Sequence, residues 1–342
     1  MKSNTLLFQG EDSVNYLNVV LILLSSVLAY YIPFHLFLFV YAFLGPLHYL
    51  TEISWLEKRN FYVSKKFDVI IYVLLCIFLF LGIFFKKVGE FTTPILIFSV
   101  VYTIIILTVK NNYLKYFLAL ISLLLIFAKM KDTLLVEKNW LLPIIIFSVL
   151  LPTLVHVYFF TGVFLLGGAL KQNKFSAYLS VFAFIICSLV LLNINSVDLQ
   201  PVSAEMQKLY DKFKMMNKSF MYVFGYNNYE NVKDIWVKSD DSIYANLYAK
   251  RTMSFIAFAY CYHYLNWFSK TTVIKWHQVS KIRLGVIFAL WVLSVGVYIW
   301  DYKIGFYTLF ILSMMHVFLE FPLNYQSFKN VISIMIKKLG FR

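Results

Sequence analysis

The sequence predicts an all-α integral membrane protein, a polytopic bundle of about ten transmembrane helices with a mostly helical extramembrane insertion. The composition supports this fold class, because 61% of the 342 residues are hydrophobic and only 14% are charged. A soluble domain carries roughly 25% charged residues, so lipid must surround most of this chain. We therefore take the lipid bilayer as its partner. We attribute the net charge of +14 to basic residues beside membrane helices, and we expect no nucleic-acid binding.

Apolar segments long enough, or nearly long enough, to cross the bilayer recur along the chain. Crossing a hydrocarbon core of about 30 Å takes about 20 residues. Ten segments qualify, near residues 14–32, 34–56, 69–85, 93–109, 113–128, 140–168, 176–194, 252–268, 284–301 and 304–323. We expect one integrated membrane domain, with helices 1 to 7 in residues 1–195 and helices 8 to 10 and a basic cytoplasmic tail in residues 251–342. The polar first fourteen residues indicate that no signal peptide is removed.

Lysine and arginine predict the orientation. With a cytoplasmic N-terminus, the cytoplasmic loops and tails hold 17 of these residues and the short external loops hold six. Cytoplasmic loops are enriched in Lys and Arg. We therefore expect both termini on the cytoplasmic side of a bacterial inner membrane.

A long polar stretch, residues 196–250, separates the seventh and eighth helices. It contains seven lysines and seven acids, so its charge does not prevent an external location. Ser203 is a candidate N-cap. Helical spacing follows in Met206, Leu209, Tyr210, Phe213 and Met216. We expect an external amphipathic helix that rests on the membrane or caps the bundle, and a solvated connector with one packed face is the alternative.

Four histidines lie inside predicted membrane helices: His48, His156, His263 and His316. Each alone is consistent with a structural histidine, but ionisable groups in membranes usually face the bundle interior and mark sites. The four lie on helices that run in one direction, at depths that differ by less than about 8 Å at 1.5 Å per residue. Four imidazoles at one depth can converge in the bundle core, as in metal sites of helical bundles.

Two carboxylates accompany these histidines. Glu52 follows His48 by four residues and Glu320 follows His316 by four, so each pair shares a helix face. We expect the carboxylates to accept the second ring N–H of ligating histidines or to bind the metal directly. Solvation at the membrane boundary is the alternative. Aromatic residues near the histidines are expected to line a slot for a long apolar substrate: Tyr49, Trp55, Tyr158, Tyr262, Tyr264 and Trp267.

The histidine segments are similar to those of a known family. The string Gly45-Pro-Leu-His-Tyr-Leu-Thr-Glu52 resembles the Pro-His-Gly-x-x-Asp element of the Brp/Blh membrane β-carotene 15,15′-dioxygenases. Residues 316–320 resemble the late Pro-His-x-x-x-Asp element of that family, and residues 259–269 resemble its aromatic His-x-x-x-His-Phe-Ser segment. His156 takes the place of the remaining histidine. The order of the four elements is that of the family.

The sequence also departs from the pattern of the family. Trp267 stands where the second histidine of its segment is expected, Phe160 stands where an acid should follow His156, and no glycine follows His48. The resemblance implies an iron(II) dioxygenase that uses O2 to cleave the central double bond of a carotenoid and release retinal. Trp267 is then expected to line the slot, since indole offers no lone pair to a metal.

Several alternatives remain open from the sequence. Imidazole ligands suit zinc as well as iron. A lipid hydroxylase or desaturase needs the same metal and the same apolar slot. A transporter or flippase with a histidine-lined pathway belongs to a different class, although no half-helix repeat is visible. An acyltransferase has a single indication, Trp276-His277.

Overall fold

The computed structural model describes residues 10–63, 65–89, 91–133, 150–194, 202–224, 244 and 247–340. Within these ranges the chain is almost entirely helical and contains no strand, which confirms the all-α prediction. Seven helical spans are long and apolar enough to cross a membrane: α1 (Glu11–Tyr31), α2 (Pro33–Glu57), α3 (Lys66–Phe84), Leu151–Gln172, α9 (Phe175–Leu192), α16 (Lys281–Trp300) and α17 (Tyr302–Lys338). The protein is therefore an integral membrane protein by the length and composition of its helices.

Three further helices coincide with predicted segments but do not meet the same criterion. In α5 (Thr92–Thr108) and α6 (Asn112–Thr133), the apolar helical stretch is shorter. The third, α14 (Leu247–Ser269), begins with charged residues, including Lys250 and Arg251. The prediction of about ten spans is thus supported for seven. The last predicted segment ended near residue 323, whereas α17 continues through Pro322 to Lys338.

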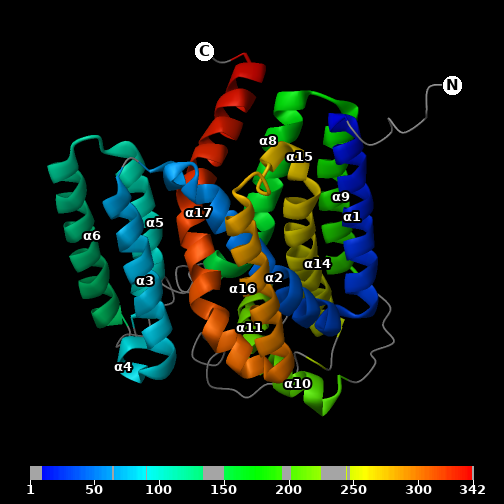
Figure 1. Ribbon diagram of the computed structural model, residues 1–342, viewed down its shortest axis with the longest axis horizontal. Coiled ribbons are helices and arrows are strands. Elements are labelled where there is room, and N and C mark those ends of the chain that lie inside the picture. The colour runs from blue at the N-terminus through cyan, green and yellow to red at the C-terminus, as the bar shows by residue number, and fades with distance from the viewer. Residues whose placement is uncertain are drawn as a thin grey trace.

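The second helix occupies the centre of the bundle. It packs against α1, α14, α16 and α17, while α9 packs against α1 and α14. The helices α3, α5 and α6 form a separate group beside α17 (Figure 1). Two apolar cores result, one around α1, α2, α9 and α14 and the other around α3, α5 and α17. Residues of α2 and of α17 belong to both cores, so these two helices join the cores.

The two ends of the bundle differ. The start of α1, the end of α17 and the short helix α15 (Thr271–Ile274) lie at one end, and α10 (Ala204–Tyr210) and α11 (Lys214–Val223) lie at the other (Figure 1). Among the described residues, α10 and α11 are therefore separated from the start of α1 and the end of α17 by the length of the bundle.

The described part of the insertion caps the bundle. Ser203 is the N-cap of α10, and its hydroxyl accepts a hydrogen bond from the Met206 backbone N–H at 3.2 Å. Tyr210, Phe213 and Met216 are buried in the first apolar core, with the Phe213 ring 4.8 Å from that of Phe37 on α2. A 3₁₀ turn, η4 (Asp211–Phe213), joins α10 to α11. The predicted N-cap at Ser203 is confirmed, but the predicted single helix is divided by η4 into two short helices. Its external location stays a prediction, and residues 195–201, 225–243, 245 and 246 lie outside the described ranges.

Candidate metal centre

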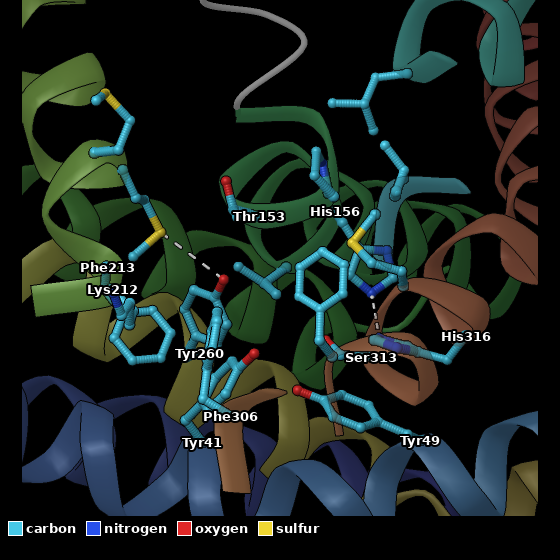
Figure 2. Close-up of a pocket in the computed structure, with 18 of the residues that line it drawn as sticks. Tyr41, Tyr49, Thr153, His156, Lys212, Phe213, Tyr260, Phe306, Ser313 and His316 are labelled. Atoms are coloured by element: carbon cyan, nitrogen blue, oxygen red, sulfur yellow. Dashed lines mark hydrogen bonds between the residues drawn. The ribbon is translucent and has the colours of Figure 1, made fainter. Parts of the chain in front are cut away.

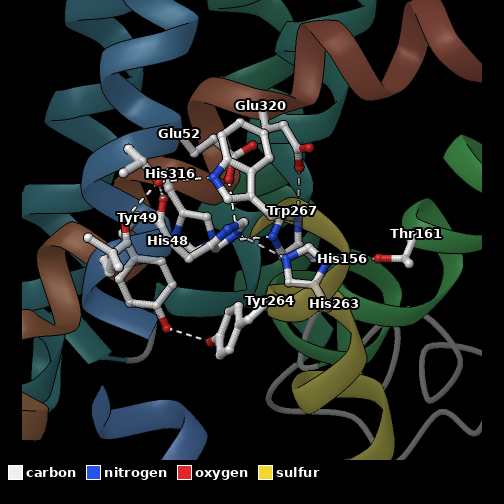
Figure 3. Close-up of polar contacts among 12 residues, drawn as sticks. His48, Tyr49, Glu52, His156, Thr161, His263, Tyr264, Trp267, His316 and Glu320 are labelled. Atoms are coloured by element: carbon white, nitrogen blue, oxygen red, sulfur yellow. Dashed lines mark hydrogen bonds and ion pairs between the residues drawn. The ribbon is translucent and has the colours of Figure 1, made fainter. Parts of the chain in front are cut away.

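The four predicted histidines meet in the bundle core. Their imidazoles form a closed ring of neighbours, with centroid distances of 4.7 Å for His48–His263, 5.0 Å for His263–His156, 5.0 Å for His156–His316 and 5.4 Å for His316–His48. All four side chains are buried. The convergence expected from their equal depth is confirmed (Figure 3). The other two histidines, His35 and His277, are exposed and lie outside this cluster.

An unusual helix carries His156. The segment η3 (Leu151–Phe160) is a π-helix with Pro152 as its second residue. It continues directly into α8 (Thr161–Gln172). A π-helix is rare, adds a residue to each turn and is often found at functional sites. The wider turns change the direction in which each side chain leaves the helix axis. His156, in this segment, points into the cluster, and the chain then continues as the ordinary α-helix α8. Pro152 lies in this irregular helix, whereas Pro46 and Pro322 lie within continuous α-helices.

Two pairs of ring nitrogens approach as ligands of one ion would. His48 Nε2 lies 3.1 Å from His263 Nε2, and His156 Nε2 lies 3.2 Å from His316 Nε2. With metal–nitrogen bonds of about 2.0 to 2.1 Å, neighbouring ligand atoms in tetrahedral or octahedral sites are about 3 to 3.4 Å apart. Within each pair, the two nitrogens therefore have the spacing of neighbouring ligands in a coordination shell.

Glu52 belongs among these ligand atoms. Its Oε2 lies 3.0 Å from His48 Nε2, the nitrogen that also faces His263. Both carboxylate oxygens are buried, and neither has a hydrogen-bonding partner among the described residues. Glu320 also interacts with Glu52, and two neighbouring buried carboxylates are costly unless a cation or a proton compensates them. Of the two roles expected for Glu52, direct binding of a metal fits this geometry.

Glu320 has a different partner from the one expected. The i, i+4 spacing pointed to His316 on the same helix, but Glu320 Oε2 lies 3.1 Å from Nδ1 of His156, which η3 carries. Asn324 Nδ2 donates a hydrogen bond to the same oxygen at 3.0 Å. Glu320 thus contacts Nδ1 of His156, the ring nitrogen that faces away from His316, and can fix the orientation of the ring. The expectation of solvated glutamates at a membrane boundary is wrong for both, since both are buried.

His263 is oriented by a residue that the sequence reasoning did not select. Its Nδ1 makes a hydrogen bond of 2.8 Å with Thr161 Oγ1, at the first residue of α8. A hydrogen bond at one ring nitrogen sets the tautomer and leaves the other for a metal. Thr161 and Asn324 are buried polar residues inside apolar helices, and that pattern is the signal from which both were predictable.

The donor set fits a divalent transition metal. Two overlapping groups, His48 with His156 and His263, and His48 with Glu52 and His316, each place their donor atoms within 4.8 Å of one another. Ionised Glu52 and Glu320 would carry two negative charges, which an ion of charge 2+ neutralises in a low-dielectric core. Sites that combine imidazoles with a carboxylate bind iron(II) in some proteins and zinc in others.

A cavity of about 310 Å³ leads to the cluster. His156 and His316 form part of its wall, and the rest of the wall is mostly apolar and aromatic, including Tyr41, Tyr260 and Phe306 (Figure 2). This volume is at the lower end of the range of ligand pockets, about 300 to 1,000 Å³. It suits one apolar chain rather than a broad molecule.

Two of the six predicted lining residues line this cavity. Tyr49 and Tyr264 face it, and their hydroxyls are joined by a hydrogen bond of 2.9 Å. The Tyr49 ring stacks on His316 with a centroid distance of 4.1 Å. Gly45 makes room for it, because a Cβ there would lie 3.0 Å from the Tyr49 hydroxyl oxygen.

The other four predicted lining residues make contacts away from the cavity. Trp267 packs edge-on to His48 at 5.4 Å and donates its Nε1–H to Thr51 Oγ1. Trp55 donates its Nε1–H to the Ile274 carbonyl. Tyr262 donates to Asn18 Oδ1, and Tyr158 stacks on Phe184. Their proximity in sequence to the histidines did not specify which face of the helix they occupy.

No family model, curated protein or solved structure matches the chain. The resemblance to the Brp/Blh family therefore stays a prediction that rests on its own residues. Among the departures from that family, Trp267 packs against His48 and donates a hydrogen bond to Thr51, and Phe160 lines a second, apolar hollow beside α5 and α17.

Proposed function

We propose that the protein is a membrane-embedded iron(II) oxygenase that acts on a long apolar substrate, with oxidative cleavage of a carotenoid to retinal as the first candidate reaction. One observation carries the proposal: a cavity with aromatic walls ends at His156 and His316, two of the four histidines that could hold a metal. A substrate in this cavity would lie against the metal and be shielded from water.

Iron(II) is the proposed metal because the donors include a carboxylate beside imidazoles, the combination found in non-haem iron oxygenases. Bound iron would supply the redox chemistry that activates O2. The protein would fix the ligands through the contacts Glu320–His156 and Thr161–His263. Zinc is the alternative metal, and it would direct the same site to hydrolysis instead.

The carotenoid is proposed from the family resemblance and from the character of the walls. The Tyr49–Tyr264 pair lies where the cavity approaches His316, so its hydroxyls could orient a polarised group of the substrate. The aromatic rings around them present flat apolar surfaces to a polyene. We further propose that both termini face the cytoplasm of a bacterium, on the basis of the uneven distribution of Lys and Arg.

A lipid hydroxylase or desaturase is the second candidate, and a specific feature favours it. The cavity includes Lys212, and a charged hollow beyond that residue shares part of its wall. A hydrocarbon carotenoid has no group that would use a lysine, whereas a lipid with an acidic end does.

Expression in carotenoid-producing cells tests the first candidate. We expect the cells to lose carotenoid colour and accumulate retinal, and we expect His316→Ala to abolish both effects while the exposed His35→Ala retains them. Unchanged carotenoid with full iron occupancy would refute carotenoid cleavage and favour the lipid oxygenase. Purified protein that carries a metal across vesicle membranes without oxidising either substrate would instead establish the transporter.

A further inference from the structure

Two hollows meet at the end of the bundle where α10 lies. The apolar cavity that reaches His156 and His316 shares Lys212, Phe213 and Phe306 with a second hollow of about 790 Å³. Figure 2 shows Lys212 and Phe213 on one side of the cavity and the two histidines on the other. Lys212, Phe213 and Phe306 thus lie between a charged hollow and the cavity that ends at the candidate metal centre.

The second hollow is charged. Residues of η4, of the neighbouring α10 and α11, and of the α16–α17 turn supply four lysines and three acids to its wall. Asp211 contacts two of these lysines, at 3.7 Å from Lys212 and 3.4 Å from Lys214. Asp301 is the N-cap of α17, where its Oδ1 accepts the Ile304 backbone N–H. The acids are thus partly engaged within the protein.

Two lysines of the hollow are available to a ligand. Lys208 and Lys303 are exposed, and neither forms an ion pair with another described residue. Lys212 lies between them and the apolar cavity and is the one lysine that borders both spaces. An acidic group in the hollow would meet positive charge at its mouth, and a chain attached to that group would have an apolar path inwards.

We propose that the two hollows form one binding site for a single-chain amphiphile with an acidic headgroup. The headgroup, a carboxylate or a phosphate monoester, lies among Lys208, Lys212 and Lys303, and the hydrocarbon chain runs through the cavity to His156 and His316. This inference rests on the proposed function for the claim that the far end of the chain reacts. To the proposed function, this inference adds the class of the substrate. It also adds the end of the protein, beside α10, at which the hydrocarbon chain enters.

Binding of radiolabelled palmitate to the purified full-length protein in detergent tests the headgroup site. We expect Lys212→Gln to weaken palmitate binding about tenfold, the loss that corresponds to about 1.4 kcal/mol for one charge-assisted contact. Hexadecanol has the same chain without the charge, and its binding should change less than about twofold. Lys281→Gln, an exposed lysine at the opposite end of α16, is the matched control and should bind palmitate normally.

Competition identifies the acidic group. Displacement of palmitate by lysophosphatidate at a lower concentration than by unlabelled palmitate assigns the site to a phosphate headgroup, and the reverse order assigns it to a carboxylate. Equal binding of palmitate and hexadecanol to the wild-type protein would overturn the inference, because the lysines would then contribute nothing.

A palmitate analogue with a diazirine on its last carbon tests the direction of the chain. After irradiation we expect labelled peptides from residues 152–157 and 313–316, and Lys212→Gln should reduce this labelling. Labelling there in protein that binds no metal would uphold this inference and refute the proposed function. Full metal occupancy with labelling spread over the lipid-facing surface of α9 would refute this inference and leave the proposed function standing.

Discussion

Replacement of Glu52 by glutamine tests whether this carboxylate binds the metal directly or only supports the residues that do. Glu52 Oε2 lies 3.0 Å from the nitrogen of His48 that faces the other histidines, and neither carboxylate oxygen has a hydrogen-bonding partner among the described residues. Glu320, in contrast, contacts the second nitrogen of His156 and accepts a hydrogen bond from Asn324. The two carboxylates therefore predict different losses of metal affinity.

The magnitudes follow from these positions. An ion bound to His48 would lie within about 4 Å of the Glu52 carboxylate, where a divalent ion and a unit charge interact by about 8 kcal/mol at an effective dielectric constant of about 20. Because the amide oxygen of glutamine keeps part of that attraction, we expect Glu52→Gln to weaken iron(II) binding by about a hundredfold to a thousandfold. For Glu320→Gln we expect about tenfold to a hundredfold, as for other residues that orient a ligand.

Competition with a chelator of known affinity measures both values on purified protein. The apoprotein provides a further check, because Glu52→Gln removes an uncompensated buried carboxylate and should leave thermal stability without metal equal to or above that of the wild type. The reasoning would be refuted by wild-type affinity in Glu52→Gln, or by a larger loss in Glu320→Gln than in Glu52→Gln.

Three further predictions concern other parts of the molecule. Thr161→Val removes the hydroxyl that holds His263 and should weaken metal binding about tenfold or more in the chelator assay, whereas Thr103→Val, which also loses a buried hydroxyl, should not. Burial lowers the pKa of Lys270 to about 8, so the folded state binds fewer protons than the unfolded state and its melting temperature should rise between about pH 8 and 10. Lys270→Met should abolish this rise, and a rise of equal size in both proteins would refute the assignment. A membrane-impermeant thiol reagent added outside cells should label a cysteine at Lys208 and miss one at Lys275, and the reverse pattern would contradict cytoplasmic termini.

The helices were predictable because the bilayer imposes a simple requirement on each of them. Any segment that crosses it must be apolar for about 20 residues, so the runs near 14–32 and 176–194 identify α1 and α9 within a few residues. The prediction was less accurate where this requirement no longer applies. The helix α17 continues as far as Lys338, beyond the polar residues Gln326, Lys329 and Asn330 before which the predicted span ended, because hydropathy does not show where a helix itself stops.

The histidine cluster was predictable from depth alone, because helices of one direction bring residues at equal depth to one level. Depth does not determine rotation about the helix axis. Glu320 therefore contacts His156 on η3 instead of His316 on its own helix, and the π-helix that turns His156 towards it leaves no hydropathy signal. The same ambiguity explains why Tyr158 and Tyr262, although close to histidines in sequence, face other helices.

The metal content of the purified protein tests the central claim most directly. Elemental analysis of protein prepared without chelators should find a single transition-metal ion per chain, predicted to be iron. Substitution of His48, His156, His263 or His316 by alanine should reduce this content, while His35→Ala should retain it. Well-folded wild-type protein without metal that also fails to take up iron(II) when it is supplied would contradict the account.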